Sequence, residues 1–196
     1  MFEVTPITSP KELDCGPTCL KMLLSYYGIE VELDQLIEEC GITVAGATGA
    51  DLMRVARLHG LDAQCYSMDA AELVRQDRPA IVSWKHNHWC VFAGRDADDR
   101  VSICNPDRGR YRMSEGTFAS LATGIEKYPG QVIGIFNGEP AYLGIEANIE
   151  AGKLFSYEGK LYRAITAIAR GEQVIEGVNA QLVGVTQVMN DLENKE

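Results

Sequence analysis

The stretch Asp14-Cys15-Gly16-Pro17-Thr18-Cys19-Leu20 leads into the first predicted helix, which we expect over residues 17–27. Proline suits the first turn of a helix, because the N–H that it lacks has no partner there, and Gly28 follows the expected end. Asp14 lies just ahead, where a carboxylate can cap free backbone N–H groups. Apolar side chains repeat at helical spacing along one face of the segment: Leu20, Leu23, Leu24 and Tyr27.

This position makes Cys15 a candidate nucleophile. The free N–H groups and the dipole at a helix N-terminus favour a thiolate, and so lower the pKa of a thiol. The same N–H groups can stabilise the oxyanion that forms when the sulfur attacks a carbonyl group. Gly16 lets the backbone and a substrate approach each other closely. The alternative interpretation of Cys15 is a buried structural cysteine at the start of a helix.

A thiol nucleophile needs a base, and the chain has three histidines. His59 ends a predicted helix, where the dipole favours a cation, and we interpret it as a surface cap. His88 opens an apolar strand, a position that can hold an imidazole rigidly. His86 lies two residues earlier and would face the same side as His88 if the chain is extended there. We expect His88 to be the base.

A third group must orient the base. If residues 89–94 and 101–104 form a hairpin, its far end brings Asn105 back beside His88. The Asn105 side chain could then accept the imidazole N–H and set the tautomer. Asp107 is the alternative orienting residue, and a plain turn is the alternative interpretation of Asn105-Pro106-Asp107.

Helices come first and strands later in the chain, which predicts an α+β fold. Two further helices fit residues 33–39 and 49–59, and Gly41 and Gly60 follow them. Apolar runs predict strands over residues 80–84, 89–93, 101–104 and 131–136.

The sequence changes in character over residues 139–151, where glycine and proline interrupt the pattern, and we expect a linker there. It separates one domain, residues 1–138, from a small β module, residues 152–196. In this module Glu158-Gly159 predicts a tight turn between two β-prone runs. A short terminal helix is expected from one apolar stripe: Val185, Val188, Met189 and Leu192.

The 196 residues carry 28 acidic and 18 basic side chains, a net charge of −10. Without a basic cluster, binding to nucleic acid or to an anionic membrane surface is disfavoured. The N-terminus lacks the basic and apolar parts of a signal peptide, and no apolar run is long enough to span a membrane, so we expect a cytoplasmic protein. We expect most of the six cysteines to be buried and reduced.

A zinc site is the competing interpretation of the same residues. Four side chains could serve as ligands, but their spacing is not that of the usual zinc pairs, so we expect neither a metal nor an organic cofactor. These side chains are Cys15, Cys19, His86 and His88.

Together, the order and spacing of these residues resemble the papain-like cysteine peptidases that process bacteriocin and peptide-pheromone leaders after a Gly-Gly pair. The resemblance covers about residues 5–136. It implies a papain-like fold, with N-terminal helices packed on an antiparallel sheet, and the roles of nucleophile for Cys15 and base for His88, with Asn105 where the family usually has Asp. The matching residues are 14–20, 22–28, 49–61, 78–81, Trp84, 87–89, Asn105-Pro106, Gly109 and Met113-Ser114.

The chain departs from that family at Ser9, six residues before Cys15, where a Gln amide usually helps to bind the oxyanion. Removing one such donor typically costs about a hundred- to a thousand-fold in rate. The hydroxyls of Ser9 and Thr8, or the Lys11 side chain, are candidate substitutes. The resemblance also implies contacts with the oxyanion or the substrate for Asp14, Gly16 and Trp84.

Residues 152–196 resemble a small β module at the ends of bacteriophage head or tail fibre-like proteins, which implies attachment or oligomerisation. The matching residues are 155–164, 167–172 and 177–180. We therefore expect a phage-encoded cysteine peptidase that hydrolyses a peptide bond in the cytoplasm of the bacterial host or within the virion. The alternative is a weak or inactive peptidase fold that serves as a structural, decoration or attachment protein of a virion.

Overall fold

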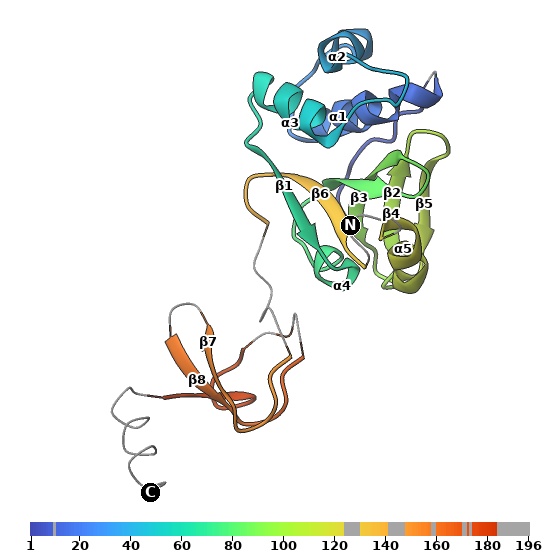
Figure 1. The fold of residues 1–196 in the computed structure, drawn as a ribbon. Helices are drawn as coiled ribbons and strands as arrows, with labels where there is room; N and C mark the ends of the chain where they lie inside the picture. The colour runs from blue at the N-terminus through green and yellow to red at the C-terminus, as the bar shows by residue number, and fades with distance from the viewer. Residues whose placement is uncertain are drawn as a thin grey trace, which may run out of the picture. The chain divides into compact units, whose positions relative to one another are not determined.

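The computed structural model describes residues 1–9, 11–123, 130–140, 148–157, 160–169, 172 and 174–183. The chain divides into two compact units, Met1–Ala141 and Tyr142–Glu196. The first unit contains a layer of helices and a six-stranded sheet, and the second contains a three-stranded sheet (Figure 1).

Three α-helices form one layer of the first unit, and all three confirm helices predicted from the sequence. They are α1 (Cys15–Tyr26), α2 (Leu33–Cys40) and α3 (Gly49–Leu58). Helix α1 begins two residues before the expected start. Leu20, Leu23 and Leu24 of α1 are fully buried, as their helical spacing predicts.

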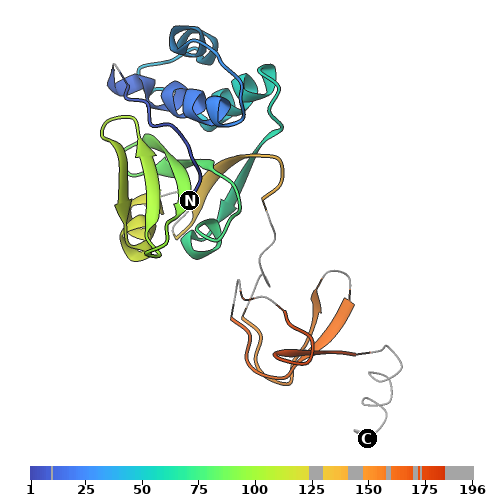
Figure 2. The same ribbon diagram turned by 180° about the vertical axis from the view of Figure 1, so that it is seen from behind.

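The sheet has the strand order β1-β6-β2-β3-β4-β5, and all neighbouring strands in it are antiparallel (Figures 1 and 2). Its four inner strands confirm the four strands predicted for this part of the chain, whereas the two edge strands had no prediction. The strands are β1 (Ala63–Met68), β2 (Ala80–Trp84), β3 (His88–Arg95), β4 (Val101–Asn105), β5 (Gly109–Met113) and β6 (Val132–Asn137).

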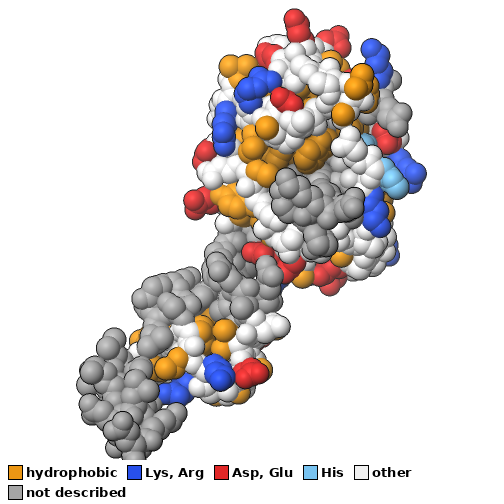
Figure 3. Space-filling model, viewed as in Figure 1, with side chains coloured by type: hydrophobic (Ala, Val, Ile, Leu, Met, Phe, Trp, Pro, Cys, Tyr) orange, Lys and Arg blue, Asp and Glu red, His pale blue; other side chains and the backbone are white. Residues whose placement is uncertain are grey.

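Both faces of the sheet bury apolar side chains. In β3, Val91 and Ala93 pack into the core beneath α1, α2 and α3. The alternate residues Cys90 and Phe92 pack into a second core with two short helices, α4 (Ala70–Leu73) and α5 (Glu115–Ala122). In the space-filling view, hydrophobic side chains gather between the helical layer and the sheet (Figure 3). Among the helices that the structure describes, none has the length and hydropathy that crossing a bilayer requires.

The second unit is a small antiparallel sheet with the order β7-β8-β9. Its strands are β7 (Leu154–Tyr157), β8 (Lys160–Ala164) and β9 (Ala180–Leu182). The rings of Phe155 and Tyr162 stack in its core, with centroids 5.9 Å apart. The predicted turn at residues 158–159 and the predicted terminal helix around residues 185–192 lie outside the described residues.

Candidate active site

Cys15 is the first residue of α1, and 5% of its surface is exposed. Burial raises the pKa of the Cys15 thiol above its ordinary value. Hydrogen bonds from the backbone N–H groups of Trp89 and Gly16 lower the pKa again, but they do not offset the burial. The lowered pKa expected from the helix N-terminus is therefore wrong, because desolvation of the buried thiolate outweighs the backbone donors.

His88 is the first residue of β3, and Asn105 is the last residue of β4. The two strands pair antiparallel, with Val91 opposite Cys104, so Asn105 returns to the end of the hairpin where His88 lies. His88 Nε2 is 3.2 Å from Asn105 Oδ1. The structure therefore brings these two side chains into contact.

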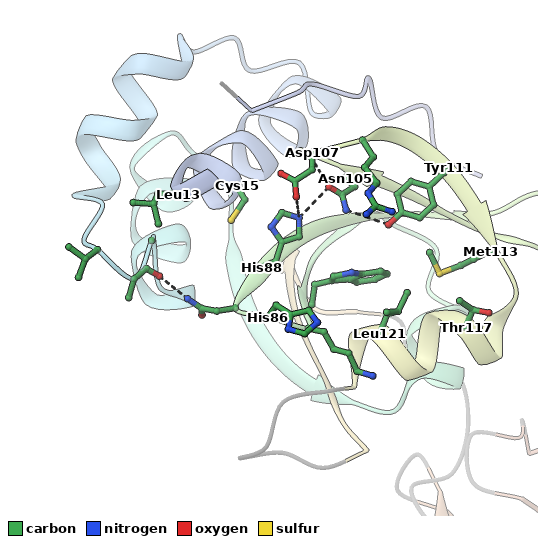
Figure 4. A pocket seen from close by; sticks show the side chains of 17 residues that line it. Leu13, Cys15, His86, His88, Asn105, Asp107, Tyr111, Met113, Thr117 and Leu121 are labelled. Carbon is green, nitrogen blue, oxygen red and sulfur yellow. Dashed lines mark hydrogen bonds and ion pairs between the residues drawn. The ribbon is translucent and has the colours of Figure 1, made fainter. Parts of the chain in front are cut away.

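The other contacts of Asn105 determine which way its amide faces. Its Oδ1 accepts the backbone N–H of Asp107 at 2.7 Å, and its Nδ2 donates to the Tyr111 hydroxyl at 3.4 Å. Because Oδ1 faces the imidazole, His88 must donate from Nε2, and the lone pair of the neutral ring is then on Nδ1. Figure 4 shows this second nitrogen on the side of the ring that faces the Cys15 sulfur. The arrangement suits transfer of a proton from Cys15 to Nδ1.

The side chains of Cys15, His88 and Asn105 line one pocket of about 550 Å³. This volume lies in the range of small-molecule and peptide sites. The pocket lining also includes apolar side chains, Trp84 from β2 and Leu121 from α5. Figure 4 shows Leu121 and Met113 on the side of His88 away from Cys15. The reactive groups thus share a cavity with room for a substrate segment.

The family model described as "Peptidase C39 family" matches residues 4–126. The chain belongs to the peptidase C39 family. The fold agrees with this assignment, because a solved double glycine motif protease from an AMS/PCAT transporter, in complex with the leader peptide, superposes with a TM-score of 0.60. That structure is 26% identical and covers 68% of this chain and 91% of its own. The peptidase domain of Streptococcus ComA has a TM-score of 0.59 at 21% identity, over 69% of this chain and all of its own.

Two secretion and transport proteins that this chain resembles are much longer than it. The colicin V secretion/processing ATP-binding protein CvaB of Escherichia coli is 25% identical over 190 residues, which are 96% of this chain and 26% of that protein. The lactococcin-G-processing and transport ATP-binding protein LagD of Lactococcus lactis is 26% identical over 124 residues, 60% of this chain and 18% of that protein. The chain therefore spans about a quarter or less of the transporters that it matches.

Within the C39 unit, Ser9 contacts the loop that holds Asn105 but does not line the described pocket. Its backbone N–H donates to the Pro106 carbonyl at 2.8 Å. Its hydroxyl donates to the Lys11 carbonyl. The Ser9 hydroxyl is therefore engaged locally, and its expected contact with an oxyanion stays a prediction.

Three other residues are expected to contact the oxyanion or the substrate: Trp84, Gly16 and Asp14. Trp84 lines the pocket. A Cβ on Gly16 would meet Ala47 Cβ at 3.1 Å, so this glycine allows close packing of α1. Asp14 makes no capping hydrogen bond, because the turn η1 (Glu12–Asp14) leaves its φ at −88° and ψ at 4°, outside the extended conformation of a cap. The proposed cap at Asp14 is thus wrong.

The segment between β2 and β3 is a tight turn, so the extended conformation considered for His86 is wrong. Both His86 and Asn87 have left-handed backbones, with φ of 62° and 55°. Asn87 Nδ2 donates to the Ala45 carbonyl at 2.9 Å, and Trp89 Nε1 donates to the Ala47 carbonyl at 3.0 Å. These bonds hold the loop 43–47 against the sheet as one wall of the pocket. Sequence reasoning missed this wall, because the loop carries no motif.

His59 lies away from the pocket and interacts with α2. Its Nε2 is 2.5 Å from Glu39 Oε2, and its side chain is 15% exposed. Hydrogen bonds from Gln35 and then from His59 lower the pKa of Glu39. His59 is the C-cap residue of α3, as predicted, and its side chain contacts Glu39 instead of lying free on the surface. Within the described ranges, no three His, Cys, Asp or Glu side chains group as metal ligands.

Proposed function

We propose that this C39 family member is a cysteine peptidase that hydrolyses a peptide bond, with Cys15 as nucleophile, His88 as general base and Asn105 as orienting residue. The hydrogen bond between His88 and Asn105, in the pocket that also contains Cys15, is the observation that carries the proposal. Thiol catalysis needs a nucleophile, a base and a group that orients the base, and these three side chains are of the types that can supply them.

The reaction would proceed through a thioester. The raised pKa keeps Cys15 a neutral thiol at neutral pH, so Nδ1 of His88 takes its proton as the sulfur attacks the peptide carbonyl. The backbone N–H groups at the start of α1 are the nearby donors for the oxyanion. His88 then protonates the leaving amine, and water releases the acyl group from the sulfur.

The substrate would be an extended peptide with small residues, such as a Gly-Gly pair, before the cleaved bond. The solved relative bound to a leader peptide is described as a double glycine motif protease, and this supports the proposal. The expected partner is therefore a peptide or protein that carries such a pair.

The test is cleavage of a synthetic peptide with a central Gly-Gly pair by the full chain, measured by mass spectrometry. A peptide with Val-Val at that place is the matched substrate control. We expect cleavage after the pair by the wild type, and loss of cleavage in Cys15→Ala and His88→Gln. The variant Cys65→Ser, at an exposed cysteine, should keep full activity. An intact peptide with the folded wild type, or cleavage by Cys15→Ala, would overturn the proposal.

The second unit supports an additional, non-catalytic function in attachment. Among the described residues of this unit, several large apolar side chains are exposed, and Val178 has the highest exposed fraction, 63%. An apolar surface of this kind suits contact with another protein. Sedimentation of the full chain and of Val178→Asp tests this: association that the substitution abolishes is expected, and a monomeric wild type would refute self-association.

None of the relatives named above is a bacteriophage protein, so the phage setting stays a prediction.

A further inference from the structure

His88 has a carboxylate neighbour, Asp107, besides the neutral amide oxygen of Asn105. Asp107 Oδ2 lies 3.6 Å from the same His88 nitrogen, Nε2. The Asp107 backbone N–H donates to Asn105 Oδ1, the atom that accepts from His88. Asn105, Asp107 and His88 therefore meet around one N–H group (Figure 4).

The loop geometry explains how both residues reach that nitrogen. The bond from the Asp107 N–H to the side chain of Asn105 spans two residues, an Asx turn, with Pro106 between them. Proline restricts φ at the middle position and so stiffens the turn. The turn directs the carboxylate of Asp107 back towards the imidazole.

Among the described residues, the carboxylate of Asp107 pairs with His88, and other charged or titratable groups line the same pocket. The charged or titratable side chains that line the pocket around His88 are Cys15 from α1, Lys85 and His86 from the turn after β2, Arg108 from the turn after β4, and Tyr111 from β5. In the part of the chain that the structure describes, Asp107 forms no ion pair with Lys85 or Arg108.

We infer that Asp107 is a positioning residue that supplies the negative charge facing the His88 imidazolium, while the neutral Asn105 supplies only the orienting hydrogen bond. The resemblance places an Asp at the position of Asn105, so this chain would divide between two residues what one carboxylate does elsewhere. The inference rests on the proposed function for its catalytic meaning. Its electrostatic part can be measured without any substrate.

The position of Asp107 also determines how its charge affects the protonation of His88 and of Cys15. Its charge stabilises the imidazolium at Nε2, and it raises the pKa of the Cys15 thiol. It therefore disfavours a thiolate in the empty pocket and favours a protonated His88 once the sulfur has attacked. The Asp107 side chain is 52% exposed in the empty pocket, and a bound peptide that displaces water would strengthen its interaction with His88.

The test is NMR titration of the His88 ring signals in the full chain, assigned by their loss in His88→Gln. The Asp107 carboxylate lies 3.6 Å from His88 Nε2. At that distance, with a dielectric constant near that of water, one negative charge changes the midpoint of an imidazole titration by roughly half a pH unit to one unit. We expect the midpoint to move to lower pH by that amount in Asp107→Asn. Asp98→Asn is the matched control, because it removes an exposed charge in the turn after β3, at the far end of that strand. The control should leave the midpoint unchanged.

The charge-transposed variant, Asn105→Asp combined with Asp107→Asn, should restore the midpoint, because a carboxylate again faces Nε2. An unchanged midpoint in folded Asp107→Asn would overturn the inference. The peptide assay separates this outcome from failure of the proposed function. If the His88 midpoint moves but the wild type cleaves no peptide, the pairing of Asp107 with His88 stands and the peptidase activity is refuted. If the wild type cleaves the peptide but the midpoint does not move, the peptidase activity stands and the role of Asp107 is refuted.

Discussion

Substitutions at Asn87 separate two contributions to the pocket wall, backbone conformation and the hydrogen bond to Ala45. The left-handed conformation at φ 55° costs an ordinary L-residue roughly 1–2 kcal/mol, whereas glycine adopts it freely and asparagine tolerates it. The exposed bond from Nδ2 to the Ala45 carbonyl, 2.9 Å long, contributes about 0.5–1.5 kcal/mol. Asn87→Ala loses the bond and gains strain, whereas Asn87→Gly loses the bond but relieves strain.

We therefore expect Asn87→Ala to be less stable than Asn87→Gly by about 1–2 kcal/mol in urea unfolding, with the wild type close to the glycine variant. Peptide cleavage should respond differently, because both variants remove one of the two side-chain bonds that hold the loop 43–47 and leave only the bond from Trp89. Both should raise KM by a similar factor and leave kcat nearly unchanged. Equal stability of the two variants would refute the role of the backbone conformation, and an unchanged KM would refute the role of the tether.

Three further predictions concern residues around α1. Ser9→Gln restores an amide where the resembling peptidases have one, and should raise kcat at least about tenfold in the peptide assay; an unchanged kcat would contradict the missing-donor explanation. Gly16→Ala places a Cβ 3.1 Å from Ala47 Cβ and 3.2 Å from Leu52 Cδ2. Overpacking of about 1–3 kcal/mol should exceed the gain in helix propensity of about 1 kcal/mol, so urea unfolding should show a net loss of stability, and a gain would refute the close packing. Because burial raises the pKa of Cys15, its alkylation rate should still increase above pH 9. The pH midpoint of this increase should lie above the midpoint in the urea-unfolded chain, and a midpoint below it would contradict the burial effect.

The inner elements of the fold could be predicted because their own residues carry the pattern. The helical spacing of Leu20, Leu23 and Leu24 reflects a face that is buried in α1, and the run Ala80–Trp84 is buried along its whole length in β2. The edge strands carry weaker patterns. In β5, Arg110 and Arg112 occupy the face opposite Tyr111 and Met113, so the strand carries only two apolar side chains, and it forms because β4 pairs with it.

The site could be predicted where chemistry follows chain order, and not where it depends on tertiary contacts. His88 and Asn105 lie at strand ends that a hairpin brings together, and Cys15 begins α1, which packs on β3. The direction of the Cys15 pKa shift depends on burial by neighbouring segments, which no local pattern reveals. The contact of Tyr111 with Asn105 likewise depends on the pairing of β4 with β5.

The most direct test of the central claim is covalent labelling with a peptidyl chloromethyl ketone that ends in Gly-Gly, followed by peptide mapping. The sulfur displaces chloride, so the adduct identifies the cysteine that meets a bound peptide. We predict one adduct per chain, on buried Cys15, although Cys65 is the exposed cysteine among the six. His88→Gln should slow the labelling at least about tenfold. Preferential labelling of Cys65, or an equal rate in His88→Gln, would contradict a Cys15–His88 peptidase site.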